Sequence, residues 1–384
     1  MPMGFSNHIL VYSDVRIEIS HFQTTEGVHE YHAMLHVTTP EAPFEKQLRD
    51  IRAAYFYLLA SHGNEVRPVF RRYFLSDAAN QVVLLQNGER PYPPCATSIV
   101  QQPPLDGSKI ALWVYLQSDM EICPRPDGIV ARHNGVSHLW CGHLISPEGE
   151  ASHQTETLLQ YYTNTLSEEN CRLEEHCIRT WVFVQNVDVN YGAVVNARRT
   201  VFERHNLTPK THYITSTGIE GRQADPACLV ALDAYAVHGL KPEQQQILYA
   251  RTHLNPTYEY GVTFERGIRI EYGDRSHIFL SGTASIDHCG NIVAPGDIQG
   301  QIDRMLENIK ALLAEAEAGE EDLAQIIVYL RDPGDYPTVK ACFEKRYAHI
   351  PGIIVWAPVC RPGWLIEMEG IAIKERNHPE FAPL

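Results

Sequence analysis

The sequence lacks the features that would place it in a membrane or give it a common cofactor site. None of its 384 residues belongs to an apolar run of 18 residues, so we expect no membrane-spanning helix. The first residues, MPMGFSN, have neither a basic start nor an apolar core, and we therefore expect no secretory signal. The motifs G-x-G-x-x-G, G-x-x-x-x-G-K-[ST], H-E-x-x-H and G-x-S-x-G are also absent, which removes the usual sequence evidence for a dinucleotide site, a P-loop, a zinc protease centre or a nucleophilic serine.

Positive charge is scarce. Lys and Arg number 32 against 47 Asp and Glu, so the net charge is −15 and the chain repels a phosphate backbone on average. We therefore expect no nucleic-acid partner. The nine cysteines form no C-x-x-C pair and their number is odd, which predicts reduced thiols and a cytoplasmic location.

Histidine is plentiful, but its spacing does not indicate a metal site. His133, His138, His143 and His153 lack H-x-H or H-x-x-x-H spacing on a clear helix, so we expect neither a metal nor another cofactor. The composition is otherwise that of a soluble globular protein, with 44% hydrophobic and 21% charged residues. The length corresponds to about two to three domains of ordinary size.

The C-terminal third alternates strands and helices in a regular order. Asp297 is a good N-cap for a helix that continues to about residue 316, with its apolar residues four and three positions apart on one face. Strand patterns precede this helix at 268–272 and 277–282. After it we expect a buried strand, a second helix and two last strands, at 323–330, 338–347, 353–356 and 364–373.

The same order recurs twice in the rest of the chain. In the middle third, residues 139–142 parallel 279–282, and residues 229–237 parallel 365–373. In the first third, the order is repeated by strands at 32–37, 69–75 and 110–116 and by helices at 44–59 and 78–85. We predict an α+β chain of three tandem repeats, each a sheet with two helices on one face. The predicted units are residues 1–125, 126–240, a connector at 241–267, and 268–384.

The C-terminal repeat resembles the Rid superfamily, also called YjgF/YER057c/UK114, in three stretches. They are SGTASIDHCGNIVAPGDIQGQIDRMLENIKALL, DLAQIIVYLRDPGDYPTVKACFEKRY and LIEMEGIAI. Members of this family are small subunits that form trimers with ligand clefts between neighbouring subunits. The resemblance implies that the three repeats fill the three places of such a trimer, as an intrachain pseudo-trimer that is itself a monomer or a dimer.

Within this superfamily, the C-terminal repeat is most similar to the chorismatases. The similar segments are SGTASI (281–286) and CRPGWLIEMEG (360–370), with GVTFERG (261–267) as a looser match to their active-site connector. The resemblance implies hydrolysis of the enolpyruvyl ether of chorismate, or action on another small carboxylate, without a cofactor.

Glu367 is the strongest candidate for a catalytic residue. Strand alternation directs Glu367 and Glu369 to one face of an otherwise apolar strand, where acids need water or partners. The repeats align Glu367 with Ala231 and Ala111, so this position is acidic once in the chain. A partly buried carboxyl has a raised pKa, which suits a general acid. The resemblance likewise implies that this glutamate lines the ligand cleft and is the proton donor.

Several further side chains are candidates for substrate binding. Arg361 precedes the last strand, and a guanidinium there can hold a carboxylate by two hydrogen bonds. Arg222 occupies the corresponding loop of the middle repeat, and Arg266 lies in the connector with Tyr260 nearby. Cys360 has no histidine close in sequence, so we expect a small buried side chain of the pocket rather than a nucleophile.

Two other functions stay open. A deaminase of enamines or imines in this superfamily carries an arginine on the strand before the last, where the alignment places Ile354 and, in the middle repeat, Thr215. Neither is cationic, which disfavours that reading. A non-catalytic protein that binds small metabolites is the other alternative, and it predicts that Glu367→Gln is tolerated.

Overall fold

The computed structural model describes residues 4–24, 27–63, 65–87 and 92–384, and its strands form three sheets of six. The first sheet has the order β1-β2-β3-β6-β4-β5. Its strands are β1 (Gly4–Tyr12), β2 (Val15–Gln23), β3 (Glu30–Val37), β4 (Val66–Leu75), β5 (Ala96–Gln101) and β6 (Ile110–Ser118). Helices α1 (Phe44–His62) and α2 (Ala78–Gln86) belong to the same repeat.

The second and third sheets have the same topology as the first. The second has the order β7-β8-β9-β12-β10-β11, with β7 (Glu121–Arg125), β8 (Gly128–His133), β9 (Val136–Ile145), β10 (Cys177–Val184), β11 (Thr215–Glu220) and β12 (Val230–His238). The third has the order β13-β14-β15-β18-β16-β17, with β13 (Gln245–Leu248), β14 (Gly267–Glu271), β15 (Arg275–Ala284), β16 (Leu323–Leu330), β17 (Gly352–Trp356) and β18 (Ile366–Glu375). The predicted class, α+β with three tandem repeats, is confirmed.

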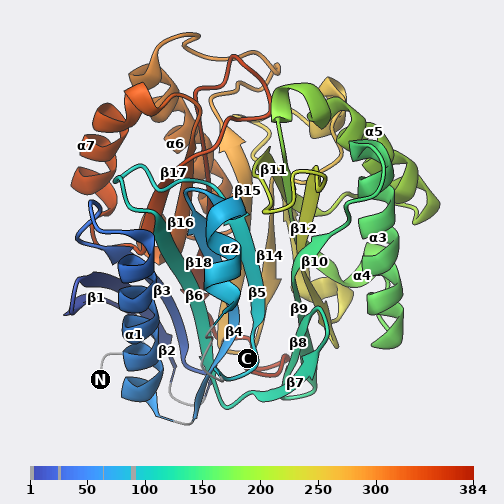
Figure 1. Ribbon diagram of the computed structural model, residues 1–384. Coiled ribbons are helices and arrows are strands. Elements are labelled where there is room, and N and C mark those ends of the chain that lie inside the picture. Colours follow the sequence, from blue (N-terminus) through green and yellow to red (C-terminus); the bar gives the residue numbers. More distant parts are fainter. Residues whose placement is uncertain (1–3, 25–26, 64, 88–91) are drawn as a thin grey trace.

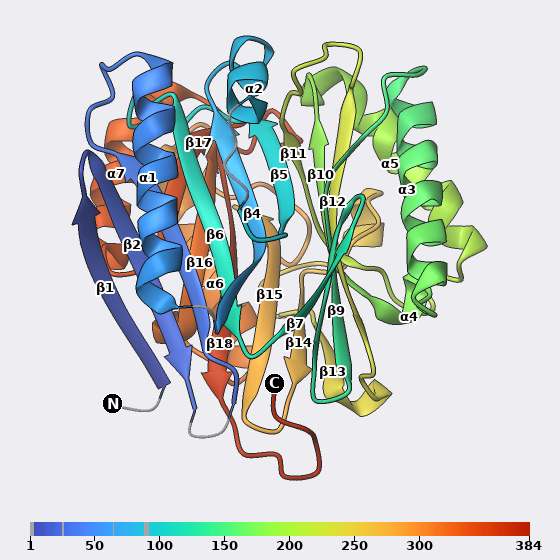
Figure 2. The ribbon, with the colours of Figure 1, turned by 60° about the horizontal axis from the view of Figure 1, so that its bottom comes forward.

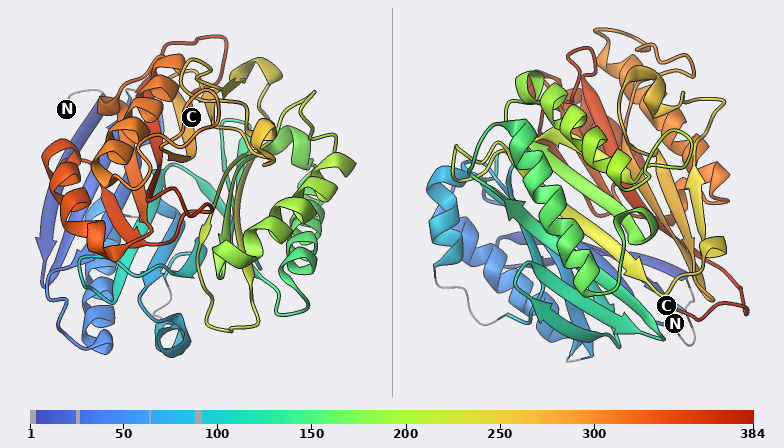
Figure 3. Two further views of the ribbon diagram at one scale, coloured as in Figure 1. Left: turned by 90° about the horizontal axis from the view of Figure 1, so that it is seen from above. Right: turned by 90° about the vertical axis from the view of Figure 1, so that its right-hand side faces the viewer.

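The helices lie on the outside of the three sheets (Figures 1 and 3). Those of the second repeat are α3 (Ala151–Glu168), α4 (Leu173–His176) and α5 (Val187–Arg204), and those of the third are α6 (Ile298–Glu315) and α7 (Tyr336–Tyr347). Asp297 caps α6 as predicted, because its side chain accepts a hydrogen bond from the Gln299 N–H. No helix in the described part of the chain is long and apolar enough to cross a membrane.

The three sheets lie with their inner faces toward one another (Figure 2). Large aromatic side chains from different repeats meet between these faces. Phe70 of β4 contacts Trp140 of β9 at 5.2 Å and Trp181 of β10 at 6.0 Å between ring centroids. On the central strands one sheet face packs on helices and the other on the neighbouring repeats, whereas the edge strand β1 is largely exposed. The inner faces form one core shared by the three repeats, and the first and second repeats each have a further apolar cluster beneath their own helices.

A buried ion pair joins each pair of neighbouring repeats. Arg72 Nη2 lies 2.8 Å from Asp233 Oδ2 between the first and second repeats. Arg179 Nη2 lies 2.8 Å from Glu369 Oε2 between the second and third. Arg275 Nη1 lies 2.6 Å from Glu30 Oε1 between the third and first. Such pairs are costly to break, because a lone charge would remain in the core.

Strand pairing shows which residues of the three repeats correspond. Glu367 pairs with Tyr329, Ala231 with Phe183 and Ala111 with Phe74, which confirms the alignment of Glu367 with two alanines. Residues 139–142, by contrast, correspond to 278–281 and not to 279–282. The ladder pairs Trp140 with Tyr235 and Phe279 with Ile371, which shifts the alignment by one residue.

The connector expected over 241–267 contains more structure than its sequence indicates. Residues Gln245–Leu248 form β13, which pairs with β14 at the edge of the third sheet. A short 3-10 helix follows at Thr257–Tyr260 and ends at Gly261, whose φ of 85° is left-handed. The stretch from 255 to 266, called the wall segment below, then leads into β14.

His36 of the first repeat lies in a cluster of charged side chains that contacts the third repeat through Glu18, and it gives a testable dependence of stability on pH. Its Nε2 lies 3.6 Å from Glu18 Oε2 and its Nδ1 lies 3.8 Å from Asp106 Oδ2, and Glu18 also accepts a hydrogen bond from the Gly352 N–H of β17. Burial opposes the charged ring, but Asp106 and Glu18 outweigh it and raise the pKa of His36 to about 9.

The native state holds this proton above pH 6.5, where the unfolded state has released it. The stability that this His36 proton adds to the native state is fully present below pH 6.5 and is lost as the pH rises to about 9. We expect the unfolding free energy of the wild type to fall by roughly 2–3 kcal/mol more than that of His36→Asn over this interval. Urea unfolding at several pH values measures it, with exposed His349→Asn as the control that follows the wild type. Parallel curves for wild type and His36→Asn would contradict the assignment.

Candidate functional site

A small pocket lies between the second and third repeats, behind the wall segment. It is called the inner pocket here, and its free volume is about 20 Å³. By that measure it holds about one water molecule, so a larger ligand enters only if the surrounding side chains move. Its lining residues are Tyr191, Ser216, Thr217, Gly218, Tyr260, Val262, Phe264, Arg266, Gly282, Ala284, Ile286, Cys360, Trp364 and Glu367.

Glu367 is the acidic residue of the inner pocket. Its side chain comes from β18, in the central part of the third sheet, and the residue is 5% exposed. Burial and the nearby Glu369 carboxylate raise the pKa of Glu367 to about 8, although Arg179 and Arg266 act in the opposite direction. The glutamate is therefore largely protonated at neutral pH. A methyl group at Gly282 would lie 2.1 Å from Glu367 Oε1, so the glycine leaves space for this carboxyl group.

Glu369 lies on the same face of β18, but its environment is different. Its carboxylate accepts hydrogen bonds from Arg179 Nη2 at 2.8 Å, Thr217 Oγ1 at 2.5 Å and Trp181 Nε1 at 2.7 Å. These donors come from the second repeat, so the Glu369 carboxyl group joins the two repeats. Two acids two residues apart thus have different roles: Glu369 is held by three donors of another repeat, and Glu367 faces a pocket.

Two buried arginines, Arg266 in the lining of the inner pocket and Arg198 against Thr263 and Ser216, have no carboxylate partner among the described residues. Arg266 lines the inner pocket, is 4% exposed, and has a buried Nε without a hydrogen-bond partner. Arg198 of α5 is 3% exposed. Its Nε donates a hydrogen bond to Thr263 Oγ1 at 2.9 Å, and its Nη1 donates one to Ser216 Oγ at 3.4 Å. Its Nη2 has no hydrogen-bond partner among the described residues. Buried cations normally have an anionic partner, so this arrangement favours an anionic ligand.

The other residues singled out around the last strand also converge here. Tyr260 and Cys360 line the pocket. Arg361 contacts its rim, since its guanidinium lies 4.8 Å from the Tyr260 ring and 5.4 Å from that of Trp364 and donates to the Tyr260 carbonyl at 2.7 Å. Burial and the Glu367 carboxyl raise the pKa of the Cys360 thiol to about 12, so no thiolate is available as a nucleophile.

Arg222 does not join this group. Its side chain is exposed and pairs with Glu220, with Arg222 Nε 3.4 Å from Glu220 Oε1. Its backbone pairs with Gln101 of the first repeat. It lies at the junction of the first and second repeats, away from the residues that line the inner pocket.

Sequence reasoning missed the contribution of the second repeat to the inner pocket. Arg198 and Tyr191 are on α5, and Ser216 and Thr217 are on β11, far from the Glu367 motif along the chain. A possible signal was Arg198 itself, an arginine among apolar residues on the buried side of α5. Among the described residues, no cluster of three His, Cys, Asp or Glu side chains could hold a metal.

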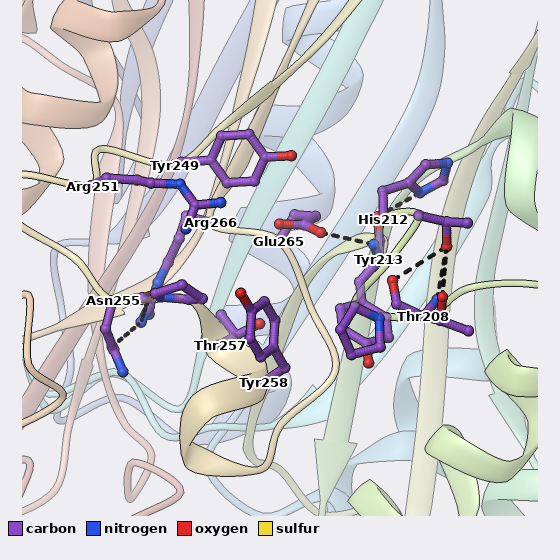
Figure 4. A pocket seen from close by; sticks show the side chains of 13 residues that line it. Thr208, His212, Tyr213, Tyr249, Arg251, Asn255, Thr257, Tyr258, Glu265 and Arg266 are labelled. Atoms are coloured by element: carbon purple, nitrogen blue, oxygen red, sulfur yellow. Dashed lines mark hydrogen bonds between the residues drawn. The ribbon is translucent and has the colours of Figure 1, made fainter.

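A second pocket, called the outer pocket here, lies on the other side of the wall segment (Figure 4). It shares Arg266 with the inner pocket and has a free volume of about 70 Å³. Figure 4 shows the Glu265 side chain between Arg251 and Tyr249 on one side and His212 and Tyr213 on the other. The full lining is Thr208, Pro209, Thr211, His212, Tyr213, Tyr249, Arg251, Asn255, Pro256, Thr257, Tyr258, Glu265 and Arg266.

Comparison with known proteins places the C-terminal repeat in a known family. The family model described as "Endoribonuclease L-PSP" matches residues 268–374. A RutC family protein of Pyrococcus abyssi is 37% identical over 100 residues, which are 26% of this chain and 79% of that protein. The 3-aminoacrylate deaminase RutC of Acinetobacter baylyi is 29% identical over 100 residues, covering 25% of this chain and 77% of the enzyme.

The fold of most of the chain also has a solved counterpart. The crystal structure of a chorismatase superposes with a TM-score of 0.64 and covers 82% of this chain and 95% of its own, at 16% sequence identity. This similarity extends well beyond the C-terminal repeat and shows a shared fold. Together with the RutC relatives and the three sheets of identical topology, it shows that the chain belongs to the Rid (YjgF/YER057c/UK114) superfamily, as three tandem repeats of that family's fold.

Proposed function

We propose that this protein hydrolyses the enolpyruvyl ether of a small carboxylate, with chorismate as the best candidate substrate and Glu367 as the general acid. The observation that carries the proposal is a buried, largely protonated carboxyl group in a pocket lined by a buried arginine, Arg266, that has no acidic partner among the described residues. A neutral acid can donate a proton at neutral pH, and unpaired guanidinium groups can hold carboxylates.

The reaction follows from these two features. Glu367 donates its proton to the terminal methylene carbon of the enolpyruvyl group, and the adjacent carbon becomes an oxocarbenium ion. Water adds to that carbon, and the resulting hemiketal breaks its bond to the ether oxygen. The products are pyruvate and the ring alcohol. One proton of the added water returns to the Glu367 carboxylate and the other ends on the alcohol, so atoms and charge balance.

The arginines around the inner pocket have the complementary role. Arg266 in the lining and Arg361 at the rim are placed to bind carboxylates of the substrate, while Arg198 supports Ser216 and Tyr191 from behind. Because the free volume is about 20 Å³, substrate entry requires the wall segment or the loop before β18 to move outward. Closure afterwards would exclude bulk water from the oxocarbenium ion.

The test is release of pyruvate from chorismate by the wild-type protein, followed with a coupled dehydrogenase. We expect stoichiometric pyruvate and a kcat within the ordinary enzyme range of about 1–10³ s⁻¹. Absence of pyruvate above the uncatalysed rate, with folded protein in excess over substrate, would reject chorismate as the substrate.

Deamination of an enamine or imine is the second candidate. The RutC relative is a 3-aminoacrylate deaminase. In such a reaction Glu367 would again be the acid that protonates a carbon atom, here that of the enamine. The register of β17 with β16 places Ile354 level with Val328, and β17 carries no cationic side chain. Arg266 and Arg361 would have to bind the carboxylate instead. Ammonia release from a 2-aminoacrylate generated in the assay separates this reaction from ether hydrolysis.

A further inference from the structure

We propose that the outer pocket is a second binding site of this chain, for a small carboxylate of two to four carbon atoms. The site lies across the wall segment from Glu367 and uses Arg251 and Arg266 as its cations. It does not depend on the proposed reaction, because its residues other than Arg266 do not line the inner pocket.

The size of the outer pocket sets the size of the ligand. Its free volume of about 70 Å³ compares with about 20 Å³ in the inner pocket. A water molecule needs roughly 10–15 Å³ by this measure, so the outer pocket accommodates on the order of five to six non-hydrogen atoms without rearrangement. Acetate, pyruvate and similar acids fall in this range, whereas a substituted ring does not.

The charges of the outer pocket favour an anion. Arg266 is 4% exposed, donates from Nη2 to the carbonyl and Oδ1 of Asn255 at 3.2 and 3.3 Å, and keeps a buried Nε without a partner. Arg251 lies over the Tyr249 ring at 4.6 Å. Within the described part of the chain, neither arginine has a carboxylate within 4 Å. Arg251 is exposed, whereas Arg266 is a buried guanidinium group without an acidic partner, which is the feature that favours an anion at this cavity.

Glu265 does not cancel this preference. Its carboxyl group accepts the Tyr213 N–H at 2.8 Å, and burial raises its pKa above the ordinary value. The lining holds two guanidinium groups against this one carboxyl group, so the pocket still favours an anion. The cavity is also lined by the polar side chains of Tyr249, Tyr258 and His212.

Arg266 connects the two pockets. The wall segment directs Tyr260, Phe264 and Arg266 to the inner pocket, while Tyr258 and Glu265 line the outer one. A carboxylate bound outside neutralises part of the Arg266 charge that a ligand inside would use. By reciprocity, occupancy of either pocket then changes the affinity of the other.

The test is a ligand-observed NMR titration with pyruvate, with pyruvamide as its neutral counterpart. We expect saturable pyruvate binding to the wild type and equally to Glu367→Gln, and no binding of pyruvamide. Arg251→Gln should weaken pyruvate binding about tenfold or more, because one charged contact is lost. The matched control is Arg204→Gln, which removes an exposed arginine from α5 and should leave the affinity unchanged.

Three results of this titration would overturn the proposal. Absence of saturable binding by the folded wild type at tens of millimolar pyruvate would overturn the proposal. So would binding that survives in Arg251→Gln but disappears in Glu367→Gln, since that result places the ligand in the inner pocket. Equal binding of pyruvamide would also overturn it, because the arginines would then have no role. Because none of these measurements uses turnover, failure of the proposed reaction leaves them unaffected.

Discussion

Glu367→Gln is expected to lower kcat for pyruvate release about 10²- to 10⁴-fold, with a much smaller change in KM. Glutamine keeps the size of the side chain and fills the same space beside Gly282, but its amide group has no acidic proton to transfer to the substrate. The arginines that bind the substrate are unchanged, which is why the effect concentrates in kcat. Exposed Glu344→Gln is the matched control and should retain full activity. A Glu367→Gln enzyme with wild-type kcat would remove Glu367 from the mechanism.

The same glutamate predicts a pH dependence that needs no substrate. Its pKa is about 8 in the folded protein against 4.5 for the ordinary side chain, so between these values the native state holds a proton that the unfolded state has lost. The wild type should therefore lose stability relative to Glu367→Gln by up to about 1.4 kcal/mol per pH unit from pH 5 to pH 8, after which the two curves run parallel. Activity should decline above pH 8 as the acid ionises. Urea unfolding and pH–rate profiles measure the two effects.

Glu369→Leu is expected to destabilise the protein by about 3–5 kcal/mol at neutral pH. The substitution removes the carboxylate that binds Arg179, Thr217 and Trp181, and leaves a buried guanidinium without its partner. Since Glu369 belongs to the third repeat and its donors to the second, the loss acts on the interface between them.

Chemical denaturation of the purified variants measures this effect. Exposed Glu344→Leu changes the same residue type outside the core and should shift stability by less than about 0.5 kcal/mol. A Glu369→Leu protein within 1 kcal/mol of the wild type would show that the repeats associate without help from this ion pair. The double variant Glu369→Leu with Arg179→Met should recover part of the stability, because no unpaired charge remains.

Elements with strong periodicity could be predicted from the sequence closely. The strand expected over 323–330 is β16 with the same bounds, and the helix after Asp297 is α6. The edge strands β1 and β7, which open the first and second repeats, were missed for a physical reason. Strand β1 lies at a sheet edge with most side chains exposed, and β7, also an edge strand, contains Pro124. Edge strands need little apolar alternation, so they leave little pattern to find.

The one-residue error in aligning the middle repeat has a local cause. Both repeats have an irregularity in the ladder at this point, where two residues of β9 or β15 are skipped between paired positions. Matching glycine to glycine aligned Gly142 with Gly282, whereas the ladder aligns His143 with Gly282. His143 adopts a φ of 60°, a left-handed conformation in which glycine would be expected, so the sequence pattern is misleading there.

The candidate site was predictable only for residues close to the Glu367 motif. Cys360, Arg361 and Glu367 are neighbours in the sequence, and the structure brings Arg266 and Tyr260 to them through the wall segment. Arg198 approaches from a different repeat, so only the packing of α5 against β11 reveals it. Arg222 was chosen by analogy between loops, but its side chain pairs with Glu220 at another junction.

The shared core of the three repeats has a consequence for behaviour on dilution. In an assembly of separate subunits, a pocket between neighbours disappears when the subunits dissociate, so its occupancy falls with protein concentration. Here the two sides of the inner pocket, β11 and β18, are parts of one polypeptide. Their local concentration is set by the tether and not by the number of molecules in solution. The pocket should therefore persist at nanomolar protein, where a trimer of single repeats would already have come apart.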